Sequence, residues 1–151
     1  MNDIATSENL GEVTYTRVFE APRDLVFRCM TTPEHLTHFW GPTGVSTSIE
    51  NITVDPRPGG AFVTIMVDDA SGAQYPMHGV FVEVTEPERL VWTERDVEGG
   101  MTTSVTFTDL GNRTTEVVAH QTNVPEMYRT AESEAGMLSS FDRFAAYLAT
   151  M

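Results

Sequence analysis

The first third of the chain changes its pattern of apolar and polar residues twice. Residues 13–19 (VTYTRVF) alternate and are rich in β-branched and aromatic types, which predicts a strand. Beyond it, apolar residues recur every three or four positions, which predicts a short amphipathic helix over residues 22–31 with a proline in its first turn. Pro33 breaks this helix and begins a second one over residues 33–39, before Gly41 ends it.

Six further segments are rich in β-branched and aromatic residues, and each is separated from the next by Gly, Pro, Asp or Asn. The separating segments suit hairpin turns and are too short for crossover helices, so the strands must be antiparallel. The predicted strands cover residues 46–54, 61–67, 75–85, 90–96, 102–108 and 114–121.

The last part of the chain predicts one long amphipathic helix. From Met127 to Leu148, apolar residues step by three and four positions. We expect Leu138, Phe141 and Leu148 to be buried. The whole order predicts an α+β fold in which this helix covers the concave face of a seven-stranded antiparallel sheet. Because a twisted sheet of this width curls, a single helix leaves space beside it, which favours an internal pocket.

Length and composition indicate one ordinary globular unit. The 151 residues contain no internal repeat or linker, so we expect a polar N-terminal tail over residues 1–12 and a single domain over residues 13–151. No apolar run approaches the roughly 20 residues that span a bilayer, and the N-terminus does not resemble a signal peptide, so neither membrane insertion nor secretion is expected. The one cysteine, Cys29, falls within an apolar helical pattern and fits a reduced, cytoplasmic protein.

The charge of the chain removes several classes of function. The formal net charge is −13, and every basic residue is an arginine. A polyanion would be repelled over most of such a surface, so nucleic acid is excluded as a partner. The lack of lysine also excludes Schiff-base catalysis and the lysine of a phosphate-binding loop.

Several short strings together resemble one known family. They are EAPRDLVF at 20–27, TPEHL at 32–36, FWGP at 39–42, DPRPGG at 55–60, GVFVEV at 79–84 and PERLV at 87–91. In combination they resemble the START-like SRPBCC superfamily, and more closely its bacterial AHSA-type branch, the homologues of an activator of heat-shock-protein ATPase. The resemblance covers roughly residues 14–149. It implies a helix-grip fold with an internal pocket, in a superfamily that includes lipid-transfer domains, plant hormone receptors and aromatic cyclases.

Two positions depart from the pattern of that branch. Met137 follows a glycine in the last helix where such relatives often carry Trp, and Glu94 stands where they often carry Trp in the fifth strand. The resemblance therefore implies a pocket that is softer and more acidic than in those relatives.

The predicted pocket lining follows from inward-facing alternation along the strands and from the apolar stripe of the last helix. Each apolar member taken alone is better explained by ordinary core packing. Glu94 and Gln121 are more informative, because an inward polar group costs about 1–3 kcal/mol unless it is paired with another side chain, water or a ligand. The predicted ligand-binding residues are Trp40, Phe62, Met66, Trp92, Glu94, Phe107, Gln121, Met137 and Phe141.

Two histidines raise the question of a metal site. His35 and His38 lie three residues apart on a predicted helix, but a zinc site needs three or four protein ligands and the sequence suggests no others. We therefore expect solvent-exposed histidines, no metal and no cofactor.

The function that these patterns favour is a carrier or sensor of a small apolar or aromatic molecule. An enzymatic alternative uses Glu94 as a general base for cyclisation, dehydration or hydrolysis, but no second catalytic group is apparent. The family name implies another alternative, a protein that binds a chaperone ATPase. A homodimer is compatible with all three functions.

Overall fold

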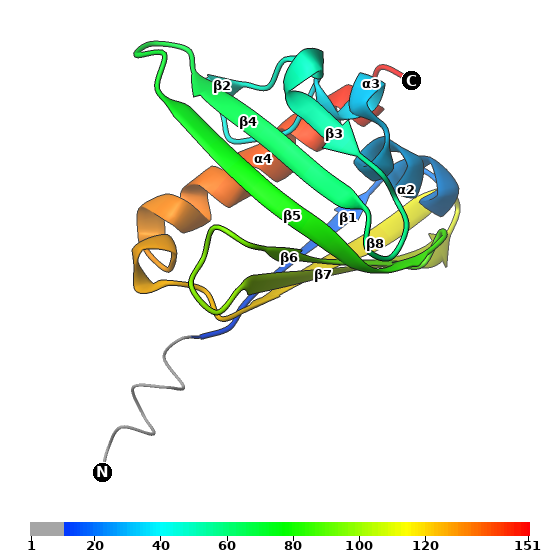
Figure 1. Cartoon of the computed structure of the whole chain (residues 1–151). Coiled ribbons are helices and arrows are strands. Elements are labelled where there is room, and N and C mark those ends of the chain that lie inside the picture. The colour runs from blue at the N-terminus through cyan, green and yellow to red at the C-terminus, as the bar shows by residue number, and fades with distance from the viewer. Residues whose placement is uncertain (1–10) are drawn as a thin grey trace.

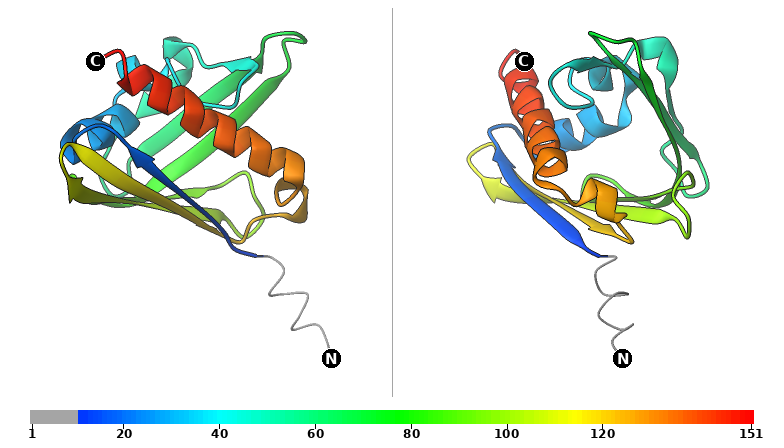
Figure 2. Two further views of the ribbon diagram at one scale, coloured as in Figure 1. Left: turned by 180° about the vertical axis from the view of Figure 1, so that it is seen from behind. Right: turned by 90° about the vertical axis from the view of Figure 1, so that its left-hand side faces the viewer.

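A curved antiparallel sheet surrounds one long helix, α4 (Ala131–Leu148), which crosses its concave face (Figure 1 and Figure 2). The computed structural model describes residues 11–151, so residues 1–10 of the predicted tail lie outside the described residues. This arrangement confirms the predicted α+β helix-grip fold.

Within residues 11–151 the sheet contains eight strands, and every pairing between them is antiparallel. Their order is β1-β8-β7-β6-β5-β4-β2, and β3 also pairs with β4. The strands are β1 (Val13–Phe19), β2 (Val45–Ser46), β3 (Ile52–Val54), β4 (Ala61–Asp68), β5 (Gln74–Thr85), β6 (Arg89–Glu94), β7 (Met101–Gly111) and β8 (Thr114–Thr122).

Eight strands replace the seven expected because the predicted strand over residues 46–54 is interrupted. A single 3₁₀ turn, η1 (Ile49–Asn51), separates β2 from β3. Just before it, Thr47 is tied to the helical segment instead of to the sheet: its hydroxyl donates to the Trp40 carbonyl oxygen at 3.0 Å, and its own carbonyl accepts from the Thr37 hydroxyl at 2.7 Å. These two bonds draw the chain away from β4.

Two short helices follow β1, as predicted. They are α2 (Arg23–Thr31) and α3 (Pro33–Leu36). The predicted helix over residues 33–39 ends early, although a hydrogen-bonded turn continues it, with Trp40 N donating to the Leu36 carbonyl oxygen at 2.9 Å. Cys29 of α2 is completely buried, and burial raises the pKa of its thiol to about 11. The thiol is therefore held as a neutral, unreactive core group.

Helix α4 is anchored mainly through its C-terminal half. Phe144 and Leu148 are buried against the core, while Phe141 and Met137 are half-buried. The expectation that Leu138 is buried is wrong, because its side chain is 46% exposed. Leu138 lies one position away from the stripe formed by the other four residues and so points off the sheet.

Gly136 faces a loop and not the concave space. A Cβ placed there would meet Pro42 Cβ at 3.6 Å, an ordinary van der Waals contact. Because glycine in a helix interior costs about 0.5–1 kcal/mol relative to alanine, Gly136→Ala should raise the free energy of unfolding by that amount in a denaturant titration.

Gly60→Ala is the matched control for this prediction. A Cβ at Gly60 would collide with the carbonyl oxygen of Asp55, so the same change should there be destabilising. A loss of stability in Gly136→Ala would contradict the open geometry beside Pro42.

Candidate functional site

A row of paired residues crosses the middle of the concave face. Trp92 of β6 pairs with Thr103 of β7, which in turn pairs with Gln121 of β8. Gln121 Nε2 donates to Thr103 Oγ1 at 3.3 Å. The predicted polar residue Gln121 is therefore inward-facing, and its partner is a threonine of the neighbouring strand.

An aromatic cluster covers the centre of this face. The Phe62 ring lies 5.4 Å from the Trp40 ring and 5.0 Å from the Trp92 ring, centroid to centroid. It also stacks on Phe81 of β5 at 5.2 Å with an interplanar angle of 4°. The Trp40 indole nitrogen donates to Thr64 Oγ1 at 3.2 Å, so this indole is fixed in place. Three predicted site residues are thus brought together.

Phe81 is the member of this cluster that the sequence did not reveal. A β-bulge follows it, since the register of β5 against β6 shifts between Phe81 and Glu83. An extra residue in one strand reverses the inward and outward alternation beyond it. Alternation with Gly79 was the one available signal that Phe81 faces inward.

Glu94 lies two residues beyond Trp92 on the same face of β6. Its neighbours across the sheet are Gly79 on one side and Met101 on the other. Burial, and to a smaller extent the negative charge of Asp96, raises the pKa of the Glu94 carboxyl from its ordinary 4.5 to about 7. Such a carboxyl exchanges a proton near neutral pH and can either donate or accept a hydrogen bond.

Gly79 allows the Trp92 indole to lie close to the Glu94 position. A Cβ at Gly79 would approach Trp92 Cδ1 to 3.3 Å, Met77 Sδ to 3.1 Å and the Phe62 carbonyl oxygen to 3.0 Å. The pyrrole edge of the indole therefore lies against the residue that pairs with Glu94.

The Trp92 indole N–H finds no hydrogen-bond partner in the described part of the chain. The side chain is only 4% exposed, and within residues 11–151 no acceptor lies within bonding distance of Nε1. An unpaired buried donor costs about 1–3 kcal/mol, and native proteins keep few of them. This unpaired donor lies on the face of β6 that also carries Glu94, so a ligand or water is expected to supply its acceptor.

The remaining predicted residues lie at other points of the interior. Phe107 packs against Phe27 of α2, with ring centroids 5.3 Å apart, and the structure does not bring it to the aromatic cluster. Phe141 lies toward the β1 side, 6.2 Å from the Tyr15 ring. Met66 and Met137 are half-buried.

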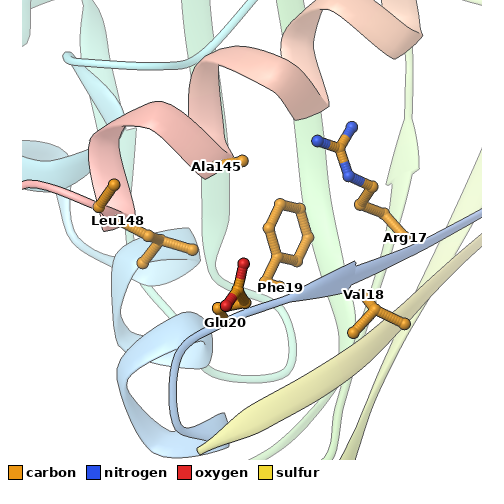
Figure 3. A pocket seen from close by; sticks show the side chains of 7 residues that line it. Arg17, Val18, Phe19, Glu20, Ala145 and Leu148 are labelled. Atoms are coloured by element: carbon orange, nitrogen blue, oxygen red, sulfur yellow. The ribbon is translucent and has the colours of Figure 1, made fainter.

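Two hollows lie along the seam between β1 and α4, and Arg17, which lines the first of them, forms an ion pair with Asp142 at 2.8 Å. Their volumes are about 280 and 310 Å³, and none of the predicted site residues lines either one. The first, shown in Figure 3, is lined by Arg17, Val18, Phe19, Glu20, Ala145, Leu148 and Ala149. The second is lined by Val13, Tyr15, Arg129, Thr130, Ala131 and Glu134.

The two histidines considered as metal ligands contact an aromatic side chain. His35 Nδ1 lies 2.6 Å from the Tyr147 hydroxyl, so the expectation that His35 is simply exposed is wrong. His38 is exposed and stacks on the Tyr147 ring at 5.0 Å. The described part of the chain contains no group of three His, Cys, Asp or Glu side chains placed to hold a metal ion.

Comparison with known proteins places this geometry in a family. A family model described as "Activator of Hsp90 ATPase homolog 1-like protein" (AHSA1) matches residues 20–149. The chain belongs to this family. A comparison with curated proteins finds no match.

Solved structures share the fold of this AHSA1-like chain over most of its length. A protein from Chromobacterium violaceum has a TM-score of 0.82 and 26% identity, and the match covers 90% of this chain and 96% of that chain. A protein from Nitrosomonas europaea has a TM-score of 0.80 and 26% identity, and the match covers 95% of this chain and 97% of that chain. The AHSA1-like protein from Aeromonas hydrophila has a TM-score of 0.77 and 22% identity, and the match covers 93% of both chains.

The candidate site of this AHSA1-like protein is the concave surface around Trp92 and Glu94, with Phe62, Phe81 and Trp40 beside it. Among residues 11–151, no helix combines the length and the apolar character that crossing a bilayer requires.

Proposed function

We propose that this protein is a cytoplasmic carrier or sensor that binds a small, largely apolar molecule between the sheet and α4. The observation that carries the proposal is the buried and unpaired Trp92 indole N–H, within an aromatic surface and on the same face of β6 as the partly buried Glu94 carboxyl. Binding sites for small molecules are mostly apolar with a few placed polar groups, which is this composition.

The middle of α4 supports the same proposal. Met137 and Phe141 are only half-buried, although they belong to the stripe that faces the sheet, and Met66 on β4 is half-buried as well. Flexible methionine side chains adapt to ligands of different shapes. Family membership supports a ligand-binding or an activator-homologue role in general terms.

Ligand binding should be visible as stabilisation of the folded protein. A ligand bound only by the folded state stabilises it by about 2.7 kcal/mol at a hundredfold excess over Kd, so a thermal-shift screen of apolar molecules should register micromolar binders. Native mass spectrometry of the purified protein should in addition detect a retained small molecule.

Tryptophan fluorescence should locate the binding. Because Trp92 lies at the proposed site, a ligand should alter its emission, and Trp92→Phe should abolish most of the response. Trp40→Phe is the matched control and should keep the Trp92 response. If a broad set of fatty acids, aromatic polyketides and sterols gives no thermal shift, the concave face is a packed core and the proposal fails.

The family description favours one second candidate, stimulation of a chaperone ATPase. It is tested by adding the purified protein to an Hsp90-type chaperone and measuring ATP hydrolysis. Stimulation that persists in Trp92→Phe and Glu94→Gln would assign activity to a surface outside the candidate site.

A further inference from the structure

The chemistry of the unpaired Trp92 N–H and of the neighbouring Glu94 carboxyl specifies what the ligand must carry. We infer that the polar end of the ligand is an uncharged hydroxyl group, which accepts a hydrogen bond from Trp92 Nε1 and donates one to Glu94. The inference rests on the proposed function and narrows it from apolar molecules in general to apolar alcohols and phenols.

The two groups are neighbours along one face of β6. Trp92 and Glu94 are separated by two positions on one strand, so their side chains leave β6 on the same face. The pyrrole edge of the indole lies against Gly79, and Gly79 is the residue that pairs with Glu94. Gly79 has no side chain, so the space over it is shared by the indole edge and Met77 Sδ.

A hydroxyl is the group that satisfies both partners. The indole N–H is a donor only, so it requires an acceptor, while an ionised carboxylate accepts only and requires a donor. The oxygen of a ligand hydroxyl accepts a hydrogen bond from the Trp92 indole N–H. The same hydroxyl donates its proton in a hydrogen bond to the Glu94 carboxylate. When Glu94 is protonated, the same oxygen accepts from the carboxyl as well.

A carboxylate ligand is disfavoured by the charges around the site. It would stand beside Glu94, with Asp96 two residues further along the chain, and like charges repel strongly in a buried setting. The arginines that β1 and α4 place near the interior are already engaged. Arg17 pairs with Asp142, and Arg143 donates to the carbonyl oxygens of the loop that begins at Gly41.

An ammonium ligand satisfies only one of the two groups. Glu94 and the faces of Phe62 and Phe81 would attract a cation. An ammonium has no acceptor, however, so the Trp92 N–H would remain unpaired and buried. The unpaired Trp92 N–H therefore favours a hydroxyl ligand over an ammonium ligand.

The test uses four probes with one apolar body: naphthalene, 2-naphthol, 2-naphthoate and 2-naphthylmethylamine. Calorimetric titration of the full chain at neutral pH should give 2-naphthol a Kd lower than that of each other probe by about tenfold or more. Equal or tighter binding of the naphthoate or the amine would overturn the hydroxyl assignment, and so would equal binding of naphthalene. If none of the four probes binds, the proposed function itself fails.

The indole signals of the ¹⁵N-labelled protein report the contact directly. The chain has two tryptophans, and the Trp40 indole is already bonded to Thr64, so its signal is an internal control. With 2-naphthol, the Trp92 Nε1–H signal should move downfield, as expected for a newly formed hydrogen bond, while the Trp40 signal moves less. Binding of 2-naphthol without this shift would overturn the role of Trp92.

A pair of variants tests the role of the Glu94 charge. Glu94→Gln keeps the shape and an acceptor oxygen, so 2-naphthoate binding should tighten by about tenfold while 2-naphthol binding stays within a few-fold. Glu116→Gln removes the same charge from the outward face of β8, where Glu116 pairs with the exposed Val18. This control should change neither 2-naphthoate binding nor 2-naphthol binding. Unchanged naphthoate binding in Glu94→Gln would refute exclusion by this carboxyl.

Discussion

Replacing Phe144 with alanine should lower the free energy of unfolding by about 3–5 kcal/mol, the usual cost of truncating a large aromatic core residue. The Phe144 side chain is only 3% exposed. Its ring stacks on Phe39 with centroids 4.0 Å apart and lies 4.8 Å from the Phe19 ring. It therefore joins α4 both to β1 and to the turn after α3, and denaturant unfolding followed by circular dichroism measures the loss.

Two other positions on α4 provide controls for this prediction. Leu138→Ala should cost less than about 0.5 kcal/mol because Leu138 is largely exposed. The loss of unfolding free energy in Phe141→Ala should lie between those of Leu138→Ala and Phe144→Ala, since Phe141 is half-buried against Tyr15 and Phe19. A loss at Leu138 as large as at Phe144 would mean that α4 is rotated about its axis relative to this structure.

Glu94→Gln should make the protein more stable in alkaline solution and leave its stability unchanged in acid. The folded-state pKa of Glu94 is raised from 4.5 to about 7, so the carboxyl favours folding when it is protonated. Its contribution is fully present below about pH 4.5 and is lost as the pH rises through 7. A pKa difference of this size corresponds to at most about 3 kcal/mol.

The measurement is the difference in unfolding free energy between the variant and the wild type as a function of pH. It should be near zero at about pH 4.5 and should reach up to about 3 kcal/mol in favour of the variant at about pH 8. Glu116→Gln, which removes a charge from the convex face, should show less than about 0.5 kcal/mol at both values. A flat difference for Glu94→Gln would mean that its carboxyl is solvated.

The sequence predicted the elements whose residues repeat with a clear period. The long alternating segments became β4 to β8, and the three-and-four spacing after Pro125 became α4. The segment over residues 46–54 alternates too, but the hydrogen bonds of Thr47 with Trp40 and Thr37 decide its path. Such contacts join residues several positions apart through side chains, so no local period reveals them.

The candidate site was predictable only in part, for two physical reasons. Alternation correctly predicted that Trp92, Glu94 and Gln121 share the concave face, since that depends on strand geometry alone. It could not show that Gln121 bonds to a threonine while the Trp92 N–H remains unpaired, because both facts depend on distances across the sheet. Phe81 was missed because the bulge after it shifts the alternation of β5, so no single period over that strand identifies its inward residues.

The open sheet has two outer edges, and neither one offers a long exposed strand with which another chain could pair. Free strand edges act as templates for pairing with other chains, and short strands or flanking helices reduce that hazard. One edge is formed by β2 and β3, which have two and three residues, so it offers little continuous backbone to a foreign strand. The other is β1, along which α4 lies, tied by the ion pair between Arg17 and Asp142. The net charge of −13 at neutral pH adds repulsion between like molecules, which also opposes edge-to-edge pairing.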